Sequence, residues 1–265
     1  MTDQPYGSFT PREYQAFIRT AAAELQAAVR VGPEDTPVPA CPGWTLRDLV
    51  AHLGAVHEWA ASIVASGAAE RPERVAPATP PTGAELTEWY DQQVRLLLET
   101  LARTDPAQAC WTHQRGYRVA AYWSRRQAHE LAMHLVDAES ALGRTPHYDA
   151  GLAVDGIGEV LDVWLPRVAA YTKRHPDLAG PLALRCTDRP ELWLLAPCPD
   201  TAPKITGPHL GGAPQPGAGG PVVAEIRGGA VDLLLALWKR LDLDQLTVEG
   251  DADVARRFLA SALTP

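Results

Sequence analysis

The sequence predicts an α+β protein in which an N-terminal bundle of four to five helices is followed by a small α+β domain. Three observations support this fold class. Up to residue 175, apolar residues recur at helical spacing between proline-rich breaks, and several of these segments begin with a capping motif. After that point, short β-like runs alternate with turns. We therefore expect residues 1–175 to form the bundle and residues 176–265 to form the second domain.

The first three expected helices of the first domain each begin with a capping motif. Thr10 and Glu13 form a capping box with Pro11 at the first helical position, and Thr45 and Thr82 are expected to cap the next two helices. Gly143 suits the end of the fourth helix. The resulting helices are expected over residues 10–30, 45–67, 82–103, 118–142 and 152–173.

The second domain is expected to mix short strands with two helices. The strands are expected at residues 182–186, 192–195, 222–226 and 246–248, and the helices at 230–241 and 251–263. Residues 199–220 are rich in proline and glycine, which predicts a loop or flexible connector.

Composition excludes several classes of protein. The chain has 265 residues, of which 46% are hydrophobic and 21% charged, which excludes wholesale disorder. Its formal net charge is −8, whereas a nucleic-acid-binding protein normally carries a positive patch. We therefore expect no nucleic-acid partner.

The sequence also predicts a cytoplasmic protein without a membrane partner. No segment approaches the roughly 18 apolar residues that a membrane helix needs, and residues 1–10 lack the apolar core of a signal peptide. The four cysteines are far apart and form no CxxC pair, so we expect neither a disulfide framework nor a zinc ribbon.

The fourth expected helix carries the most informative polar residues. Glu130 and His134 are four residues apart and project from one face, which is the spacing by which a helix offers two ligands to one metal ion. Asp137, one turn further on, can hold the other ring nitrogen of His134. The alternative is a solvated polar face. A zincin motif is excluded because Met133 stands where its second histidine would be, and His129 is expected to pack or to form a hydrogen bond.

His52 is the best candidate for a third ligand. It lies in the middle of an apolar stripe on the second expected helix, where a histidine must find a partner or stay neutral. The alternative is a core histidine with an ordinary hydrogen bond. His57 lies off this stripe and is expected to be exposed. A His/Glu/His set with an open position is the pattern of a catalytic zinc site, which can stabilise a thiolate.

Three segments together resemble the mycothiol-dependent maleylpyruvate isomerase family. The segment CPGWTLRDLVAHLG at residues 41–54 resembles the family's opening motif, and residues 126–137 resemble its second motif. Residues 226–251 resemble its C-terminal domain. The resemblance covers nearly the whole chain.

The resemblance implies a DinB-like helical bundle that binds a divalent metal, usually zinc. The family's metal ligands match His52, Glu130 and His134. The family also uses an arginine of the C-terminal domain, for which Arg240 is the best match and Arg227 the alternative. Members often carry a basic residue after the second ligand histidine, where this chain has Leu135, which leaves the substrate open.

We therefore expect a zinc enzyme that takes mycothiol and an electrophilic small molecule. The reaction expected first is the cis–trans isomerisation of a maleylpyruvate-like enedioate by thiolate addition, rotation and elimination. Arg240 or Arg126 would bind the substrate carboxylate and stabilise the enolate, although Arg126 could instead merely pair with Glu130. The alternatives are a mycothiol S-transferase and a non-catalytic, metal-binding regulatory protein.

Two residues ahead of the second expected helix have open roles. Cys41 is expected to pack, the alternative being a reactive thiol near the helix N-terminus. Trp44 is expected to act as a hydrophobic staple on Leu49, and the alternative is that its ring forms a wall of the site.

Overall fold

The computed structural model describes residues 7–73, 81–114, 116–198, 201–210 and 220–265. Most of the segment that bears on a signal peptide, residues 1–6, lies outside this range. Among the described residues, no helix is both long enough and apolar enough to cross a membrane. The chain folds as two compact units, residues 1–147 and 148–265. This division falls before residue 175, because the helical segment that starts at Ala150 packs against a helix of the second unit.

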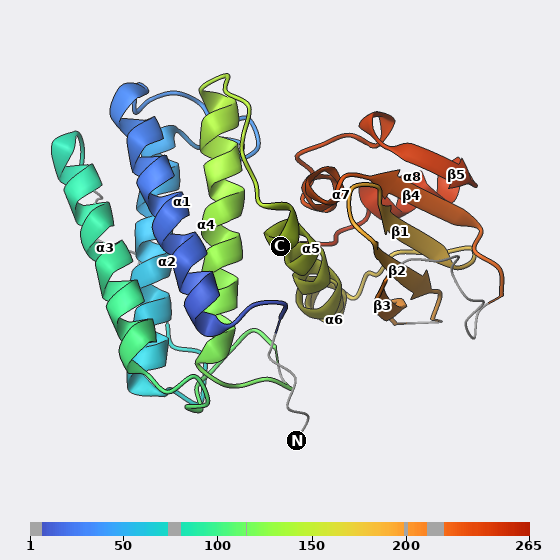
Figure 1. The fold of residues 1–265 in the computed structure, drawn as a ribbon, viewed down its shortest axis with the longest axis horizontal. Helices are drawn as coiled ribbons and strands as arrows, with labels where there is room; N and C mark the ends of the chain where they lie inside the picture. The colour runs from blue at the N-terminus through green and yellow to red at the C-terminus, as the bar shows by residue number, and fades with distance from the viewer. Residues whose placement is uncertain (1–6, 74–80, 115, 199–200, 211–219) are drawn as a thin grey trace. The chain divides into compact units, whose positions relative to one another are not determined.

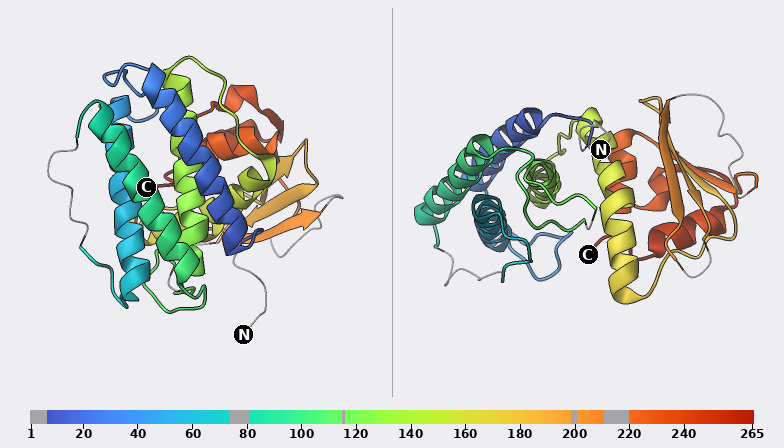
Figure 2. Two further views of the ribbon diagram at one scale, coloured as in Figure 1. Left: turned by 60° about the vertical axis from the view of Figure 1, so that its left-hand side comes forward. Right: turned by 90° about the horizontal axis from the view of Figure 1, so that it is seen from below.

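The first unit is a four-helix bundle (Figures 1 and 2). Its helices are α1 (Pro11–Val31), α2 (Leu46–Ser66), α3 (Ala84–Arg103) and α4 (Ala121–Ala141). Helices α1 and α2 each pack against both α3 and α4. In the bundle, α1 therefore lies diagonally opposite α2, and α3 lies diagonally opposite α4. The predicted bundle followed by an α+β domain is confirmed.

Two of the three expected caps are present in the bundle. The Thr10 hydroxyl accepts from the Glu13 amide at 3.3 Å, and the Glu13 carboxylate accepts from the Thr10 amide at 2.7 Å. Thr45 and Asp48 form the same reciprocal pair at the start of α2. The expected cap at Thr82 is wrong, because α3 begins one residue later with Gly83 at its cap and no side chain bonded there. The cap at Thr45 fixes the start of α2 and hence the direction in which His52 projects.

The second unit packs helices against one face of a mixed sheet (Figure 1). The elements are α5 (Ala150–Glu159), the π-helical turn η1 (Val160–Trp164), α6 (Leu165–Thr172), β1 (Leu182–Cys186), β2 (Glu191–Ala196), β3 (Lys204–Leu210), β4 (Ala224–Gly228), α7 (Ala230–Leu237), the 3₁₀ turn η2 (Leu243–Gln245), β5 (Thr247–Gly250) and α8 (Ala252–Ala260). The strands run in the order β3-β2-β1-β4-β5, with β1 parallel to β4 and every other pair antiparallel. Helix α7 packs on β1 and β4, helix α8 packs on β4 and β5, and α5 packs on α7.

Two expectations for this unit need correction. The expected loop at 199–220 contains strand β3, which is an edge strand and so tolerates Pro208, whose nitrogen has no hydrogen to donate to a neighbour. Residues 199–200 and 211–219 of that expected loop lie outside the described residues. The single helix expected at 152–173 is divided by the turn η1, which ends next to Pro166, a residue that cannot continue the helical hydrogen-bond ladder.

Candidate metal centre

Helices α2 and α4 bring the three expected ligands together. His52 of α2 lies with its Nε2 3.1 Å from Oε1 of Glu130, and His134 places its Nε2 3.8 Å from the same oxygen. The three ligand atoms all lie within 4.8 Å of one another. Their side chains are 13–22% exposed, so the set is largely sheltered from solvent but still accessible to it. His52 from the apolar stripe of α2 thus meets Glu130 and His134, which share a face of α4, at one place in the bundle.

Asp137 fixes the orientation of His134. Its Oδ2 lies 2.9 Å from Nδ1 of His134, one helical turn away, and the Asp137 side chain is fully buried. A carboxylate only accepts hydrogen bonds, so Nδ1 carries the proton and the lone pair of the neutral ring lies at Nε2, on the side of Glu130. The expected contact between Asp137 and His134 is confirmed.

The donor set suits a divalent metal ion. Zinc–nitrogen and zinc–oxygen distances of about 2.0–2.1 Å in a tetrahedron place two ligand atoms about 3.3 Å apart. The nitrogen–oxygen separations of 3.1 and 3.8 Å at Glu130 lie on either side of that value. Small side-chain rotations would therefore bring two imidazole nitrogens and one carboxylate oxygen onto one ion, with a further coordination position left open.

Arg126 holds the carboxylate of Glu130 from the other side. Its Nη2 donates to Oε2 of Glu130 at 2.7 Å, and its side chain is buried. Burial by itself would raise the pKa of Glu130. The hydrogen bond with His52 and the charge of Arg126 together lower it by more than burial raises it, so the pKa lies well below the usual 4.5. Glu130 is therefore an anion ready to bind a cation. Of the two expectations for Arg126, its contacts favour pairing with Glu130.

The same surroundings act on the ring of His134. Burial by itself would lower the pKa of His134. The hydrogen bonds with Asp137 and Cys41 raise it by more than burial lowers it, so the pKa reaches about 9. Without a metal, the ring is therefore a cation at neutral pH. A metal ion must displace a proton from Nε2 to bind there.

Trp44 forms one wall of the set. The centroid of its ring lies 4.7 Å from that of His52 and 6.0 Å from that of His134, nearly parallel to the latter. The contacts with both imidazoles support the alternative role given to Trp44, a wall of the site.

The two neighbouring histidines lie away from the set. The expectation that His57 is exposed is wrong: it is fully buried, with Nδ1 2.6 Å from Oε1 of Gln127, because α3 and α4 cover both sides of α2. Burial lowers the pKa of His57 to about 4, so this ring is neutral at physiological pH. His129 is buried with its ring edge-on to Tyr14, which confirms the expected packing role.

The two candidate arginines belong to the second unit. Arg240 follows α7 and is partly exposed, with Nη1 donating to the Trp238 carbonyl at 2.7 Å and the guanidinium 5.8 Å from the centre of the Trp238 ring. Arg227 lies on β4, where it pairs with Glu249 across the sheet and lies 3.7 Å from Glu225. Both of these carboxylate partners of Arg227 belong to its own sheet.

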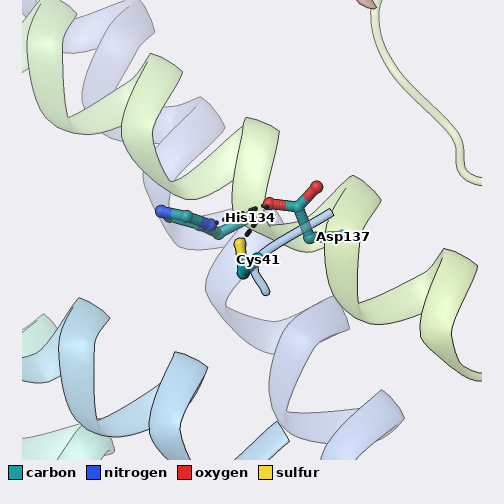
Figure 3. Close-up of side chains that lie close together, drawn as sticks. All are labelled: Cys41, His134 and Asp137. Atoms are coloured by element: carbon teal, nitrogen blue, oxygen red, sulfur yellow. Dashed lines mark hydrogen bonds and ion pairs between the residues drawn. The ribbon is translucent and has the colours of Figure 1, made fainter. Parts of the chain in front are cut away.

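Cys41, which was expected to pack near the start of α2, has its thiol beside His134 and Asp137 (Figure 3). Sγ of Cys41 is 3.5 Å from Oδ2 of Asp137. No local pattern predicts this contact, because the two residues are separated by 96 positions and belong to different segments of the bundle.

Fold and site define the class of protein: a helical bundle that presents a His/Glu/His donor set, followed by an α+β unit. Residues 15–139 match the family model described as the mycothiol maleylpyruvate isomerase N-terminal domain. Residues 151–257 match the MDMPI C-terminal domain. The chain belongs to the mycothiol-dependent maleylpyruvate isomerase family.

Two solved structures share this fold. Both are crystal structures of the mycothiol-dependent maleylpyruvate isomerase, one of them of a mutant. They are 15% and, for the mutant, 14% identical in sequence, each with a TM-score of 0.58 over 91% of this chain and 93% of the other. At this level of identity the likeness shows the fold alone. No curated protein sequence matches the chain.

Proposed function

We propose that this protein is a zinc-dependent isomerase that uses mycothiol to convert a maleylpyruvate-like cis-enedioate into its trans isomer. The observation that carries the proposal is the convergence of His52, Glu130 and His134 on one point, with Nε2 of His134 directed there by Asp137. Membership of a family named for mycothiol and maleylpyruvate supports the choice of thiol and substrate.

In this proposal, His52, Glu130 and His134 hold the metal. When bound, the ion would lower the pKa of the thiol so that a thiolate is available at neutral pH to add to, and later leave, the substrate double bond. Two neutral imidazoles and one carboxylate leave a divalent ion with a net charge of +1, which suits an anionic sulfur ligand.

The surrounding residues position these ligands. Asp137 keeps the proton of His134 on Nδ1, and Arg126 holds Oε2 of Glu130 so that Oε1 remains directed at both histidines. The ring of Trp44 covers one side of the imidazoles and keeps water from that side. The partial exposure of the ligand side chains leaves a way in for thiol and substrate.

Arg240 is proposed to bind a substrate carboxylate and the enolate that forms when the thiol adds. A guanidinium offers two parallel N–H donors to such an anion. In the structure, Nη1 of Arg240 donates to the Trp238 carbonyl at 2.7 Å, which holds the guanidinium beside the Trp238 ring. Arg126 is proposed to act through Glu130, since it is buried against that carboxylate.

Product analysis tests the proposal. The zinc-loaded protein is incubated with mycothiol and maleylpyruvate, the products are separated, and their molecular masses are measured by mass spectrometry. We expect a product of unchanged mass and full recovery of the thiol. A product heavier by one thiol would indicate an S-transferase, and absence of any conversion together with absence of thiol binding would indicate a non-catalytic protein.

A further inference from the structure

A second cluster of metal-ligating side chains lies behind His134. It consists of Cys41 from the segment that precedes α2, together with His134 and Asp137 of α4 (Figure 3). Oδ2 of Asp137 is 2.9 Å from Nδ1 of His134 and 3.5 Å from Sγ of Cys41. The three ligand atoms lie within 4.8 Å of one another. In this cluster His134 contributes Nδ1, whereas its Nε2 is directed at Glu130 and His52.

The separations approach those of a tetrahedral metal site. Metal–sulfur and metal–oxygen bonds of about 2.3 and 2.0 Å place the two ligand atoms about 3.5 Å apart, and a nitrogen–oxygen pair about 3.3 Å apart. The sulfur–oxygen separation of 3.5 Å already has this value. The nitrogen–oxygen pair at 2.9 Å would need to open by a few tenths of an ångström.

The donor chemistry differs from that of the His52 set. A thiolate is a soft ligand, and sites that combine sulfur with imidazole select thiophilic ions such as Zn²⁺ and Cd²⁺ over the hard ions that prefer oxygen alone. Asp137 is buried at the base of the cluster, whereas Cys41 is partly exposed and outside any disulfide. An incoming ion would therefore meet the sulfur first and the carboxylate last.

We propose that Cys41, Nδ1 of His134 and Asp137 form a second binding site for a thiophilic divalent cation. The site stands on these three residues alone and does not require an ion at the His52 set. Where the proposed zinc centre is also correct, the two sites exclude each other, because a neutral imidazole offers a lone pair on only one of its two nitrogens. A thiophilic ion behind His134 would then displace the catalytic zinc.

Titration of the metal-free full-length protein with Cd²⁺ tests the site. Coordination of a thiolate produces a sulfur-to-cadmium charge-transfer absorption in the ultraviolet, which nitrogen and oxygen ligands do not give. We expect this absorption to grow with Cd²⁺ and to reach its plateau at about one ion per chain, since one cluster supplies one site. We expect Cys41→Ser and Cys41→Ala to lose it, with far-ultraviolet circular dichroism showing that both variants are folded.

Two further variants make the assignment specific. Cys198→Ser removes the exposed cysteine of the second unit and should keep the absorption. His52→Ala should also keep it, because His52 is not a ligand of this site, so the result separates this proposal from the zinc centre. The absence of the absorption in the unaltered protein, or its persistence in the Cys41 variants, would overturn the proposal. In the latter case the sulfur would belong to another cysteine, and a loss in Cys198→Ser would identify which one.

Discussion

His134 and Asp137, one turn apart on α4, are joined by a hydrogen bond of 2.9 Å between Nδ1 and Oδ2. In the absence of an ion at Nδ1, this contact keeps the proton of the neutral ring on Nδ1, so that the lone pair of Nε2 is directed at Glu130 and His52. The proposed metal centre would therefore depend on a buried residue that is not itself one of its three proposed ligands.

Removing the charge of Asp137 should weaken zinc binding while leaving every proposed ligand of the centre in place. For Asp137→Asn we expect the dissociation constant for zinc to rise about 10- to 100-fold, the usual cost of losing such a supporting contact. The measurement is a competition titration against a chromogenic chelator. Asp91→Asn, which alters an ion-paired surface carboxylate of α3, should bind zinc normally. Equal affinity of Asp137→Asn and the unaltered protein would show that Asp137 does not orient the ligand.

Zinc binding should release a proton. The pKa of His134 is about 9 in the metal-free protein, so the ring is charged at pH 7 and must lose its Nε2 proton when the ion binds. We expect about one proton to be released per zinc at pH 7, and the apparent affinity to rise about tenfold per pH unit between pH 7 and 8.5. Calorimetric titration in two buffers of different ionisation enthalpy measures the release. An affinity that is constant over this range would argue against coordination by His134.

His57 should make the fold sensitive to acid. Its pKa falls from 6.5 to about 4 on folding, so between these values the unfolded chain binds a proton that the folded chain does not. Its contribution to stability is complete above pH 6.5 and is lost as the pH falls toward 4, by about 3 kcal/mol in all. Urea unfolding at several pH values should give a smaller acid loss for His57→Leu than for the unaltered protein. Parallel pH curves for the two proteins would show that His57 does not cause the acid sensitivity.

Arg240 should affect turnover without affecting the metal. We expect Arg240→Ala to bind zinc normally and to lower kcat about 10²- to 10³-fold, the typical cost of removing a donor that stabilises a developing oxyanion. Zinc content, melting temperature and kcat are measured on the same preparation. Arg227→Ala serves as the comparison, because Arg227 is paired with carboxylates of its own sheet. Normal turnover in Arg240→Ala with a loss in Arg227→Ala would transfer the role to Arg227.

The sequence predicted the parts of the site that follow from local periodicity. Glu130 and His134 share a face because they are four residues apart, and His52 was singled out because it interrupts an apolar stripe. Capping motifs at Thr10 and Thr45 placed the starts of α1 and α2 to within a residue. These features depend only on neighbours along the chain.

The features that the sequence did not predict depend on contacts between distant segments. His57 looked exposed on its own helix, but α2 is covered by two neighbours rather than one. The contact of Cys41 with Asp137 spans 96 residues and leaves no periodic trace. The sequence did not predict strand β3, because its glycine and proline are typical of loops. A strand tolerates these residues here because β3 lies at the edge of the sheet.

His52, Glu130 and His134 are proposed to hold the catalytic metal together. The most direct test is the zinc content of the unaltered protein and of His52→Ala after metal removal, reloading and dialysis, measured by elemental analysis. We predict about one zinc per chain in the unaltered protein and in His147→Ala, which alters an exposed histidine, and a loss of most of that zinc in His52→Ala. Full zinc occupancy in His52→Ala would show that His52 is not a ligand of the metal.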